Sequence, residues 1–295
     1  MVLIKKDSKR KAKIYNSISD NQLELLNFNG ILKLIKIIIN HLNQPQNLTT
    51  IRDIYYQDVE IFNKNQQECK KLLVELFEES FGWSLTDDLN IHPTQKGLFF
   101  SNILVNKYEV SLIPINFIEY FKDIKLERNT IKVIILEKDA VFQSFCQYLM
   151  NQKHQLNNHQ FKYIIITAKG FADNLTIKFL TFLNLEFQPT TIYGFFDSDI
   201  YGIMIYSQYK EKCGDNIEFN GIFLMDIAPK NWLNISDRDF GIMSTMSNKD
   251  VSTTTHREIT RGMYFHKKVE MNVISDKSLT TDTNYNQYIF KKVFQ

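Results

Sequence analysis

Two adjacent tyrosines near residue 55 carry the side chains best suited to a chemical step. The stretch from Ile51 to Phe62 reads I-R-D-I-Y-Y-Q-D-V-E-I-F, and Arg52 stands four positions before Tyr56. Residues four apart on a helix share one face, so the guanidinium and this phenol are predicted to lie together. A phenol with a pKa near ~10 is a poor nucleophile, but a fixed cation favours the phenolate and also holds a phosphate. This pair could attack a DNA phosphodiester, whereas Tyr55 and Tyr56 taken alone are typical of half-buried aromatics.

Three acidic residues follow apolar segments further along the chain. Glu137 comes after Ile131–Leu136, and the pair Asp197 and Asp199 comes after residues 191–196. Carboxylates two positions apart at a strand end point to the same side. Three carboxylates repel one another unless a cation neutralises them, and hard oxygen ligands suit Mg²⁺, with Mn²⁺ as the alternative. The pattern predicts a metal site for phosphoryl transfer, and capping or surface aspartates are the simpler reading.

The composition excludes several classes of protein. The 295 residues contain 35 basic and 33 acidic side chains, so nucleic-acid binding would depend on local patches. Three widely spaced cysteines form neither a disulfide framework nor a zinc spacing, which predicts a reducing compartment. No apolar run approaches the roughly 20 residues of a membrane span, and we expect no membrane.

The first part of the chain predicts helices in the order of a DNA-binding domain. Residues 1–22 are expected to form a basic tail. From residue 23 onward, apolar residues at helical spacing predict a helix that ends before Pro45, a helix capped at Thr50 that carries the tyrosines, and a third from about 66 to 81. Leu89 and Ile91 alternate like a strand, and Lys96–Phe100 is interpreted as its return strand in a wing. This order predicts a winged-helix domain at 23–125, including a linker from about residue 101.

The remaining residues, 126–295, predict an α/β domain with a mainly parallel sheet. Apolar strands at 131–136, 163–167, 191–196 and 222–225 alternate with helices near 140–149, 175–182 and 202–210. Ligands of such sheets gather at the carboxyl ends of the strands. Glu137, Lys169, Asp197 and Asp199 all stand there.

These motifs together resemble a known family. Glu137 with the D-x-D of Asp197 and Asp199 resembles a Toprim domain. N-I-H-P-T-Q-K-G-L, I-I-L-E-K-D-A-V-F, T-A-K-G-F-A-D and F-F-D-S-D-I-Y-G follow the tyrosine motif in the order typical of the topoisomerase VI A subunit family. The resemblance spans roughly Ile31 to Met271 and is closest to the meiotic members, which open the double-strand breaks that start recombination. The later motif F-H-K-K-V-E-M-N also resembles that meiotic branch.

The resemblance implies a role for each residue of the motifs. Tyr56 matches the nucleophile and Arg52 the arginine that assists at the phosphate and contacts DNA. Glu137, Asp197 and Asp199 match the magnesium ligands. Two further positions, Lys96 and Phe171, match residues that lie against DNA, although Phe171 taken alone is typical of a core residue. Lys169 is also expected to contact DNA, with an ordinary exposed lysine at a strand end as the alternative. Ile200 stands where the family has a proline, which would stiffen the turn, so we expect Asp199 to be held less firmly.

The resemblance therefore implies a Mg²⁺-dependent transesterase of the type IIB topoisomerase kind. It would work on double-stranded DNA as a homodimer with accessory subunits, in the nucleus on meiotic chromosomes. One alternative is the topoisomerase VI A subunit itself, which passes strands with an ATPase B subunit. The other is a DNA-binding scaffold without catalysis, against which the intact Tyr56, Glu137 and D-x-D argue.

Overall fold

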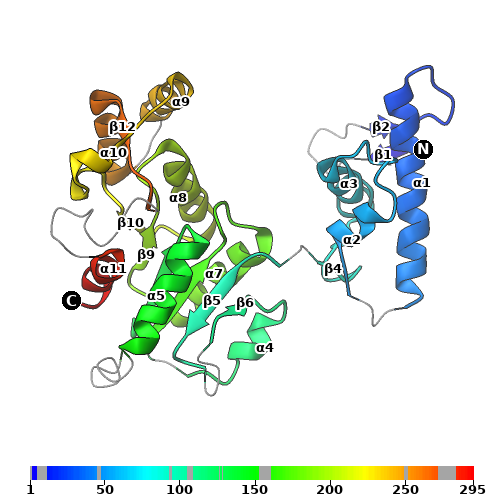
Figure 1. Cartoon of the computed structure of the whole chain (residues 1–295). Helices are drawn as coiled ribbons and strands as arrows, with labels where there is room; N and C mark the ends of the chain where they lie inside the picture. Colours follow the sequence, from blue (N-terminus) through cyan, green and yellow to red (C-terminus); the bar gives the residue numbers. More distant parts are fainter. Residues whose placement is uncertain are drawn as a thin grey trace. The chain divides into compact units, whose positions relative to one another are not determined.

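The computed structural model describes residues 2–4, 12–44, 48–92, 95–104, 109–125, 127, 129–152, 161–248, 252–271 and 284–295. The chain divides into two compact units, Met1–Thr94 and Gln95–Gln295 (Figure 1). The basic residues from Lys5 to Lys11 lie outside the described part. On either side of them, β1 (Val2–Ile4) and β2 (Ala12–Ile14) pair antiparallel.

The first unit is a small helical body around one apolar core. Its helices follow in the predicted order: α1 (Gln22–Leu42), α2 (Ile51–Tyr56) and α3 (Gln66–Leu73). A π-helical segment, η1 (Val74–Phe81), continues α3 and ends at Gly82, whose φ of 75° is the left-handed conformation that glycine adopts readily. The helix predicted at 66–81 is therefore confirmed, with a wider second half.

Helix α1 is long and apolar enough to cross a membrane by length and composition alone. The expectation that no segment approaches this length is therefore wrong for α1. Its residues Ile31, Leu34 and Ile38 are nevertheless buried in the same core as Leu72 and Leu73 of α3. This packing is typical of the core helix of a globular domain.

The second unit is built on a six-stranded sheet with the order β10-β9-β7-β8-β5-β6. Four neighbouring strands run parallel: β10 (Ile217–Gly221), β9 (Ile192–Phe195), β7 (Ile131–Leu136) and β8 (Lys162–Thr167). Two more strands, β5 (Leu98–Ser101) and β6 (Ser111–Leu112), extend it antiparallel beyond β8. The predicted mixed α/β fold with a mainly parallel sheet is confirmed.

The predicted wing is not formed by the residues that we assigned to it. Leu98–Phe100 pairs with β8 in the second unit, while β4 (Ile91–His92) pairs in parallel with β3 (Thr49–Thr50) in the first. The segment expected to be a linker after residue 101 instead supplies β6 and α4 (Phe117–Phe121). An apolar strand pattern identifies a strand but not its partner, and these residues complete the sheet because β8 would otherwise expose its edge.

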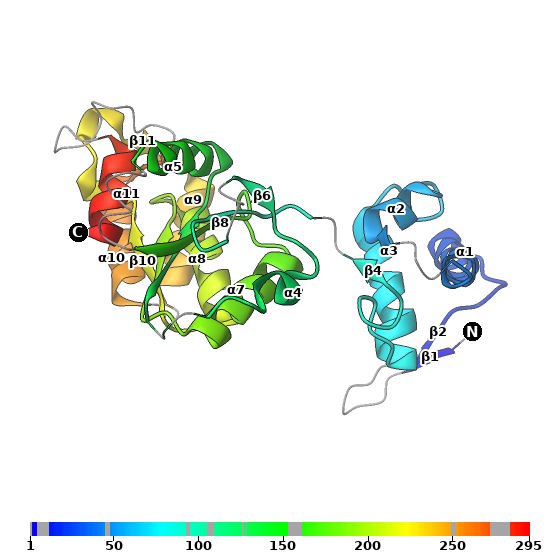
Figure 2. The ribbon, with the colours of Figure 1, turned by 90° about the horizontal axis from the view of Figure 1, so that it is seen from below.

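Helices cover both faces of the sheet. One face packs against α4, α7 (Asn174–Phe187) and α8 (Ile200–Cys213), and the other against α5 (Asp139–Asn151) and α11 (Tyr285–Phe294). Figure 2 shows the strands between α5 on one side and α4 with α7 on the other. Cys213 is buried in the first of these cores, Cys146 in the second, and Cys69 in the core of the first unit.

The chain after the sheet folds over its carboxyl edge. The prediction of a strand at 222–225 is wrong, because β10 ends at Gly221 and a short 3-10 helix, η2 (Leu224–Asp226), follows. A second 3-10 helix, η3 (Pro229–Asn231), then leads to β11 (Leu233–Asn234), α9 (Asp237–Ser247), α10 (Thr253–Phe265) and β12 (Lys267–Lys268). β11 pairs antiparallel with β12, which brings the residues after α10 back towards the sheet.

Candidate nucleic-acid cleavage site

Tyr56 stands at the end of α2 with its phenol in solvent. The helix begins at a capping box, in which Thr50 Oγ1 accepts from Asp53 N while the Asp53 carboxylate accepts from Thr50 N. Arg52 donates from Nε and Nη2 to Tyr56 Oη, over 3.3 and 3.2 Å. Tyr56 is 58% exposed. The predicted proximity is confirmed: a guanidinium is held against an accessible phenol oxygen.

Tyr55 has different surroundings from its neighbour. Its ring centroid lies 6.3 Å from that of Phe62, which is fully buried, and it packs against the core of the first unit. The capped start of α2 sets this contrast, since it turns Tyr55 inward and Tyr56 outward. Of the two phenols, Tyr56 is the one that an external phosphate can reach.

The three acidic residues lie at one edge of the parallel sheet. Glu137 follows β7, and the two aspartates follow β9, which pairs directly with β7. Glu137, Asp197 and Asp199 are 8%, 4% and 7% exposed. Glu137 Oε2 accepts a hydrogen bond from Asp197 N over 2.8 Å. The strand ends therefore place the three acids at one edge of the sheet, as predicted, while the metal site predicted there stays a prediction.

Protein donors hold each carboxylate in place. Asp197 Oδ1 accepts from Met271 N over 2.7 Å, and its Oδ2 lies 2.8 Å from Lys138 Nζ. Asp199 Oδ1 accepts from Gly202 N over 2.7 Å and thereby caps α8. Among the residues that the structure describes, no group of three or more His, Cys, Asp or Glu side chains is arranged as a metal-binding cluster. The three acids share one edge of the sheet, but as placed here they do not form such a cluster.

The acids are nevertheless suited to a cation. Burial, followed by the charge of Asp197, raises the pKa of Glu137 to about 8. Burial also raises the pKa of Asp197 to about 6, against the opposing effect of Lys138, and raises that of Asp199. Buried anions whose charged forms are disfavoured gain free energy from a nearby cation. Hard carboxylate donors in this state fit Mg²⁺ or Mn²⁺.

Ile200, which stands where the family has a proline, directly follows Asp199. Its side chain is fully buried in the core beneath α7 and α8, and it is the first residue of α8. The backbone N–H of the first residue of a helix has no partner within the helix, so proline would cost no hydrogen bond there. Either proline or isoleucine can therefore begin α8. Asp199 is held by the bond from Gly202 N, and the expectation that it is held less firmly than with a proline at position 200 stays a prediction.

The three residues predicted to contact DNA lie beside the acids. Lys96 is exposed and donates from Nζ to Phe171 O over 3.2 Å, and Phe171 is 45% exposed. Lys169 lies directly after β8, with its Nζ 3.1 Å from Asp139 Oδ2. The turn that follows is tied to the acids, since Gly170 N donates to Glu137 O over 3.0 Å. A lysine pair and an exposed ring thus border the same sheet edge.

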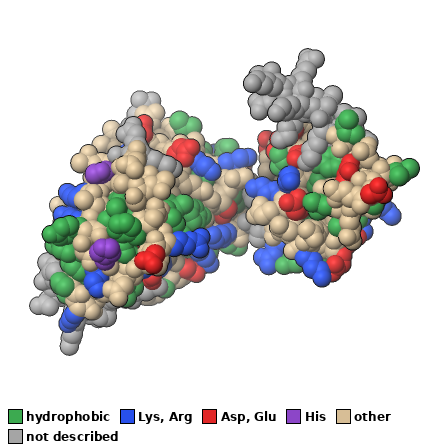
Figure 3. Space-filling view, turned by 90° about the horizontal axis from the view of Figure 1, so that it is seen from above, with side chains coloured by type: hydrophobic (Ala, Val, Ile, Leu, Met, Phe, Trp, Pro, Cys, Tyr) green, Lys and Arg blue, Asp and Glu red, His purple; other side chains and the backbone are tan. Residues whose placement is uncertain are grey.

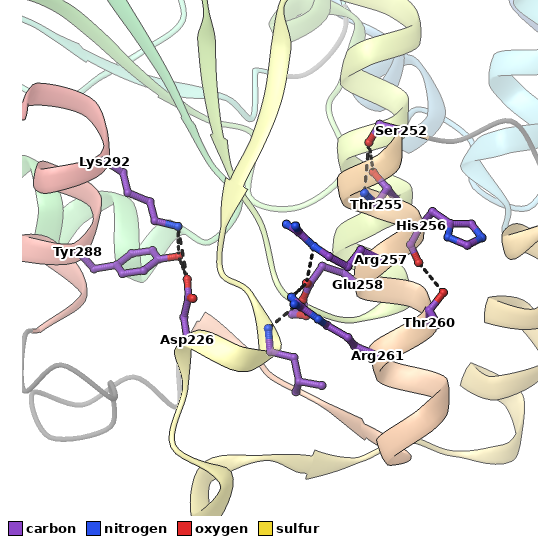
Figure 4. Close-up of polar contacts among 12 residues, drawn as sticks. Asp226, Ser252, Thr255, His256, Arg257, Glu258, Thr260, Arg261, Tyr288 and Lys292 are labelled. Carbon is purple, nitrogen blue, oxygen red and sulfur yellow. Dashed lines mark hydrogen bonds and ion pairs between the residues drawn. The ribbon is translucent and has the colours of Figure 1, made fainter.

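Glu258 is a site residue that the sequence reasoning missed. It extends from α10, is 2% exposed, and accepts from Ser198 Oγ over 3.0 Å and from Leu224 N over 2.9 Å. Arg261 Nη1 pairs with its other oxygen over 2.7 Å (Figure 4). Glu258 therefore holds the residue between the two aspartates. In the sequence, the one indication of this role is that Glu258 and Arg261 stand three positions apart, and such pairs are common on helix surfaces.

The segment after β12 also holds the aspartate turn. Val269 N donates to Ser198 O over 3.1 Å, and Met271 N supplies the bond to Asp197 described above. Backbone donors carry no residue signature, so spacing alone could not identify them. In the sequence, the motif F-H-K-K-V-E-M-N indicates only the resemblance to the family.

The surface charge is mixed. On the face drawn in Figure 3, acidic side chains stand among the lysines and arginines. This agrees with the near balance of 35 basic and 33 acidic residues. The face drawn is therefore not uniformly basic.

Comparison with known proteins links both units to DNA topoisomerases. The family model for the Toprim domain of the topoisomerase 6 A subunit and Spo11 matches residues 132–293, and the model described as type IIB DNA topoisomerase matches residues 27–91. The first match contains Glu137, Asp197 and Asp199, and the second contains Arg52 and Tyr56.

Two curated proteins are similar over most of the chain. The meiosis-specific protein SPO11 of Saccharomyces cerevisiae is 30% identical over 292 residues, covering 83% of this chain and 70% of that protein. The meiotic recombination protein rec12 of Schizosaccharomyces pombe is 29% identical over 244 residues, covering 76% of this chain and 67% of that protein. Each alignment covers more of the chain than the larger unit contains, so each reaches into both units.

Proposed function

This chain belongs to the family of the topoisomerase 6 A subunit and Spo11, and we propose that it opens DNA double-strand breaks in meiosis by transesterification at Tyr56. The observation that carries the proposal is the pair of hydrogen bonds from Arg52 to the exposed Tyr56 Oη. The names of both curated relatives refer to meiosis, which favours recombination as the process.

The proposed reaction exchanges one phosphodiester for another. Tyr56 Oη attacks a backbone phosphorus, the bond from phosphorus to the 3′ oxygen breaks, and the protein is left on the 5′ phosphate. The phenol loses its proton, and the departing 3′ oxygen gains one. Arg52 contributes to this step through its positive charge, which lies at Tyr56 Oη and would stabilise negative charge on the phosphoryl oxygens.

Glu137, Asp197 and Asp199 are the residues that would hold a divalent cation. When bound, Mg²⁺ (or Mn²⁺ as the alternative) would neutralise charge on the phosphate backbone. The buried acids, with pKa values raised by burial, support this assignment. Glu258 and Met271 are positioning residues in this proposal, because they act on the aspartate turn and not on DNA.

The DNA-binding residues proposed for the second unit are Lys96, Lys169 and Phe171. Lysine side chains bind phosphates through charge, and an exposed ring can stack on a base or lie in a groove. Both strands of a duplex must be cut, so two copies of Tyr56 are needed and a homodimer on double-stranded DNA follows. Accessory protein subunits and a nuclear location on meiotic chromosomes complete the proposal.

A topoisomerase VI A subunit that works with an ATPase B subunit is the second candidate, because the matching family description also names that protein. The two candidates differ in whether the break is resealed. Relaxation of supercoiled DNA in the presence of a co-purifying ATPase would favour the second. A scaffold without catalysis would bind DNA but form no covalent link.

The test is a denaturing gel for a covalent protein–DNA adduct. Tyr56→Phe removes only the hydroxyl, so we expect it to abolish the adduct while DNA binding persists. Tyr55→Phe is the matched control and should retain the adduct, since Tyr55 packs in the core. Equal effects of the two substitutions, or an adduct on Tyr55, would contradict the assignment.

A further inference from the structure

We propose that Lys138 competes with a divalent ion for the carboxylate of Asp197. The ammonium of Lys138 pairs with Asp197 when no metal ion is bound, and it moves to Glu270 when a metal ion binds at the acids. This inference rests on the proposed metal-dependent function. It adds a residue that opposes metal binding and one that accepts the displaced charge.

Lys138 bridges two carboxylates of different exposure. Its Nζ lies 2.8 Å from Asp197 Oδ2 and 3.2 Å from Glu270 Oε2. The side chain of Asp197 is 5% exposed and that of Glu270 is 34% exposed. The ammonium therefore stands between an inner carboxylate that belongs to the proposed metal site and an outer one that does not.

The ammonium uses an oxygen that a metal ion would need. Asp197 Oδ1 is taken by Met271 N, which leaves Oδ2 as its other ligand atom, and Lys138 holds that oxygen. A dication on the same oxygen would stand roughly 4 Å from the ammonium, where like charges repel strongly. Metal binding through Oδ2 therefore competes with the bond from Lys138 to Asp197.

Glu270 offers the displaced ammonium a place nearby. The backbone beside it is fixed, because Val269 N donates to Ser198 O and Met271 N donates to Asp197. Lys138 is also fixed at its backbone, since it precedes the first turn of α5. Only the end of the lysine side chain has to move, and it already contacts the acceptor.

The test measures Mn²⁺ binding to the full chain without DNA, by titration calorimetry and by the rise in Tm that Mn²⁺ produces. Lys138→Met should bind Mn²⁺ at least about fivefold more tightly, because the competing charge is gone. The matched control is Lys132→Met, on the same strand–helix unit, whose Nζ contacts Tyr193 Oη over 3.2 Å. It should bind Mn²⁺ like the native chain.

A charge-preserving variant keeps the test decisive if Lys138→Met does not fold. Lys138→Arg retains the cation and can bind a carboxylate through two N–H groups, so it should weaken Mn²⁺ binding. Native-like binding by this variant would overturn the inference. So would unchanged or weaker binding by Lys138→Met, since a lysine that only positions Asp197 predicts that result.

Glu270 is tested in both backgrounds. Glu270→Gln should weaken Mn²⁺ binding in the native chain, and it should have little effect when Lys138 is already methionine. Equal weakening in both would mean that Glu270 acts as a simple negative charge, and the transfer to Glu270 would be wrong. If the native chain and every variant bind no Mn²⁺, the metal role in the proposed function itself fails.

Discussion

Replacing Glu258 with glutamine removes the charge that ties α10 to the turn between Asp197 and Asp199. The carboxylate is buried and receives hydrogen bonds from Ser198, Leu224 and Arg261. Glutamine keeps one oxygen for the first two donors, but its amide turns N–H groups towards the guanidinium. The shape is preserved, and one donor faces another.

The expected loss follows from the exposure of the two partners. Removing one member of a fully buried ion pair destabilises a protein by about 3–5 kcal/mol. The side chain of Glu258 is 1% exposed, but that of Arg261 is 32% exposed, so water screens the remaining guanidinium. We therefore expect Glu258→Gln to lower the free energy of unfolding by about 2–3 kcal/mol. For a domain of this size that corresponds to a Tm roughly 4–12 °C lower.

Scanning calorimetry measures this effect. Glu218→Gln is the matched control, because Glu218 is exposed on β10 and should change stability by less than ~0.5 kcal/mol. Adding Arg261→Gln to Glu258→Gln should restore part of the stability, since it removes the unpaired charge. A Glu258→Gln protein that melts with the native chain would refute the reasoning, as would a double variant less stable than the single one.

Three further predictions concern the same edge of the sheet. Gly202→Ala should destabilise by about 3 kcal/mol in thermal unfolding, because a Cβ would collide with the Asp197 carbonyl oxygen and lie 2.8 Å from its N, whereas Gly241→Ala in open space on α9 should stabilise by about 0.5–1 kcal/mol. Lys96→Ala should reduce the salt dependence of DNA binding by a slope of about 0.9, and an unchanged slope would remove this phosphate contact. The metal-free protein should gain stability as pH falls from about 8 towards 5, because Glu137 takes up its proton at a higher pH in the folded than in the unfolded state. Glu137→Gln is neutral throughout and should flatten that Tm profile; an equally steep profile would contradict the raised pKa.

The strands that surround the acids were predictable from the sequence because they are buried on both faces. Ile131–Leu136 is apolar except for Lys132, Tyr163–Ile166 is an unbroken apolar run, and the structure contains these segments within β7 and β8. Because β7 and β9 are parallel neighbours in the sheet, Glu137 lies next to Asp197 irrespective of the conformation of the connecting loops. Arg52 and Tyr56 were predictable for a similar reason, because a short capped helix leaves little freedom in which residues share a face.

The edges of the sheet were not predictable in the same way. β10 alternates buried residues with the more exposed Glu218 and Asn220, so the sequence pattern favours the more apolar segment from Ile222 to Met225 as the strand. Lys96–Phe100 has the pattern of a strand, and pattern does not identify a partner across the chain. Glu258 and Met271 hold the aspartate turn through hydrogen bonds to residues 60 or more positions away in the sequence. The spacing of residues within a local motif does not predict such contacts.

Each apolar core of this protein contains one buried thiol, and none of the three is paired. Burial raises the pKa of Cys69, Cys146 and Cys213, so their reactive thiolate forms are suppressed in the folded state. A thiol reagent can therefore modify each cysteine only after its own core opens. Timed alkylation followed by peptide mass analysis would report three separate opening rates from the unaltered chain. DNA or Mn²⁺ that tightens the acidic edge should slow labelling of Cys146 and Cys213 on the two faces of the sheet, whereas DNA held at α2 alone should slow only Cys69.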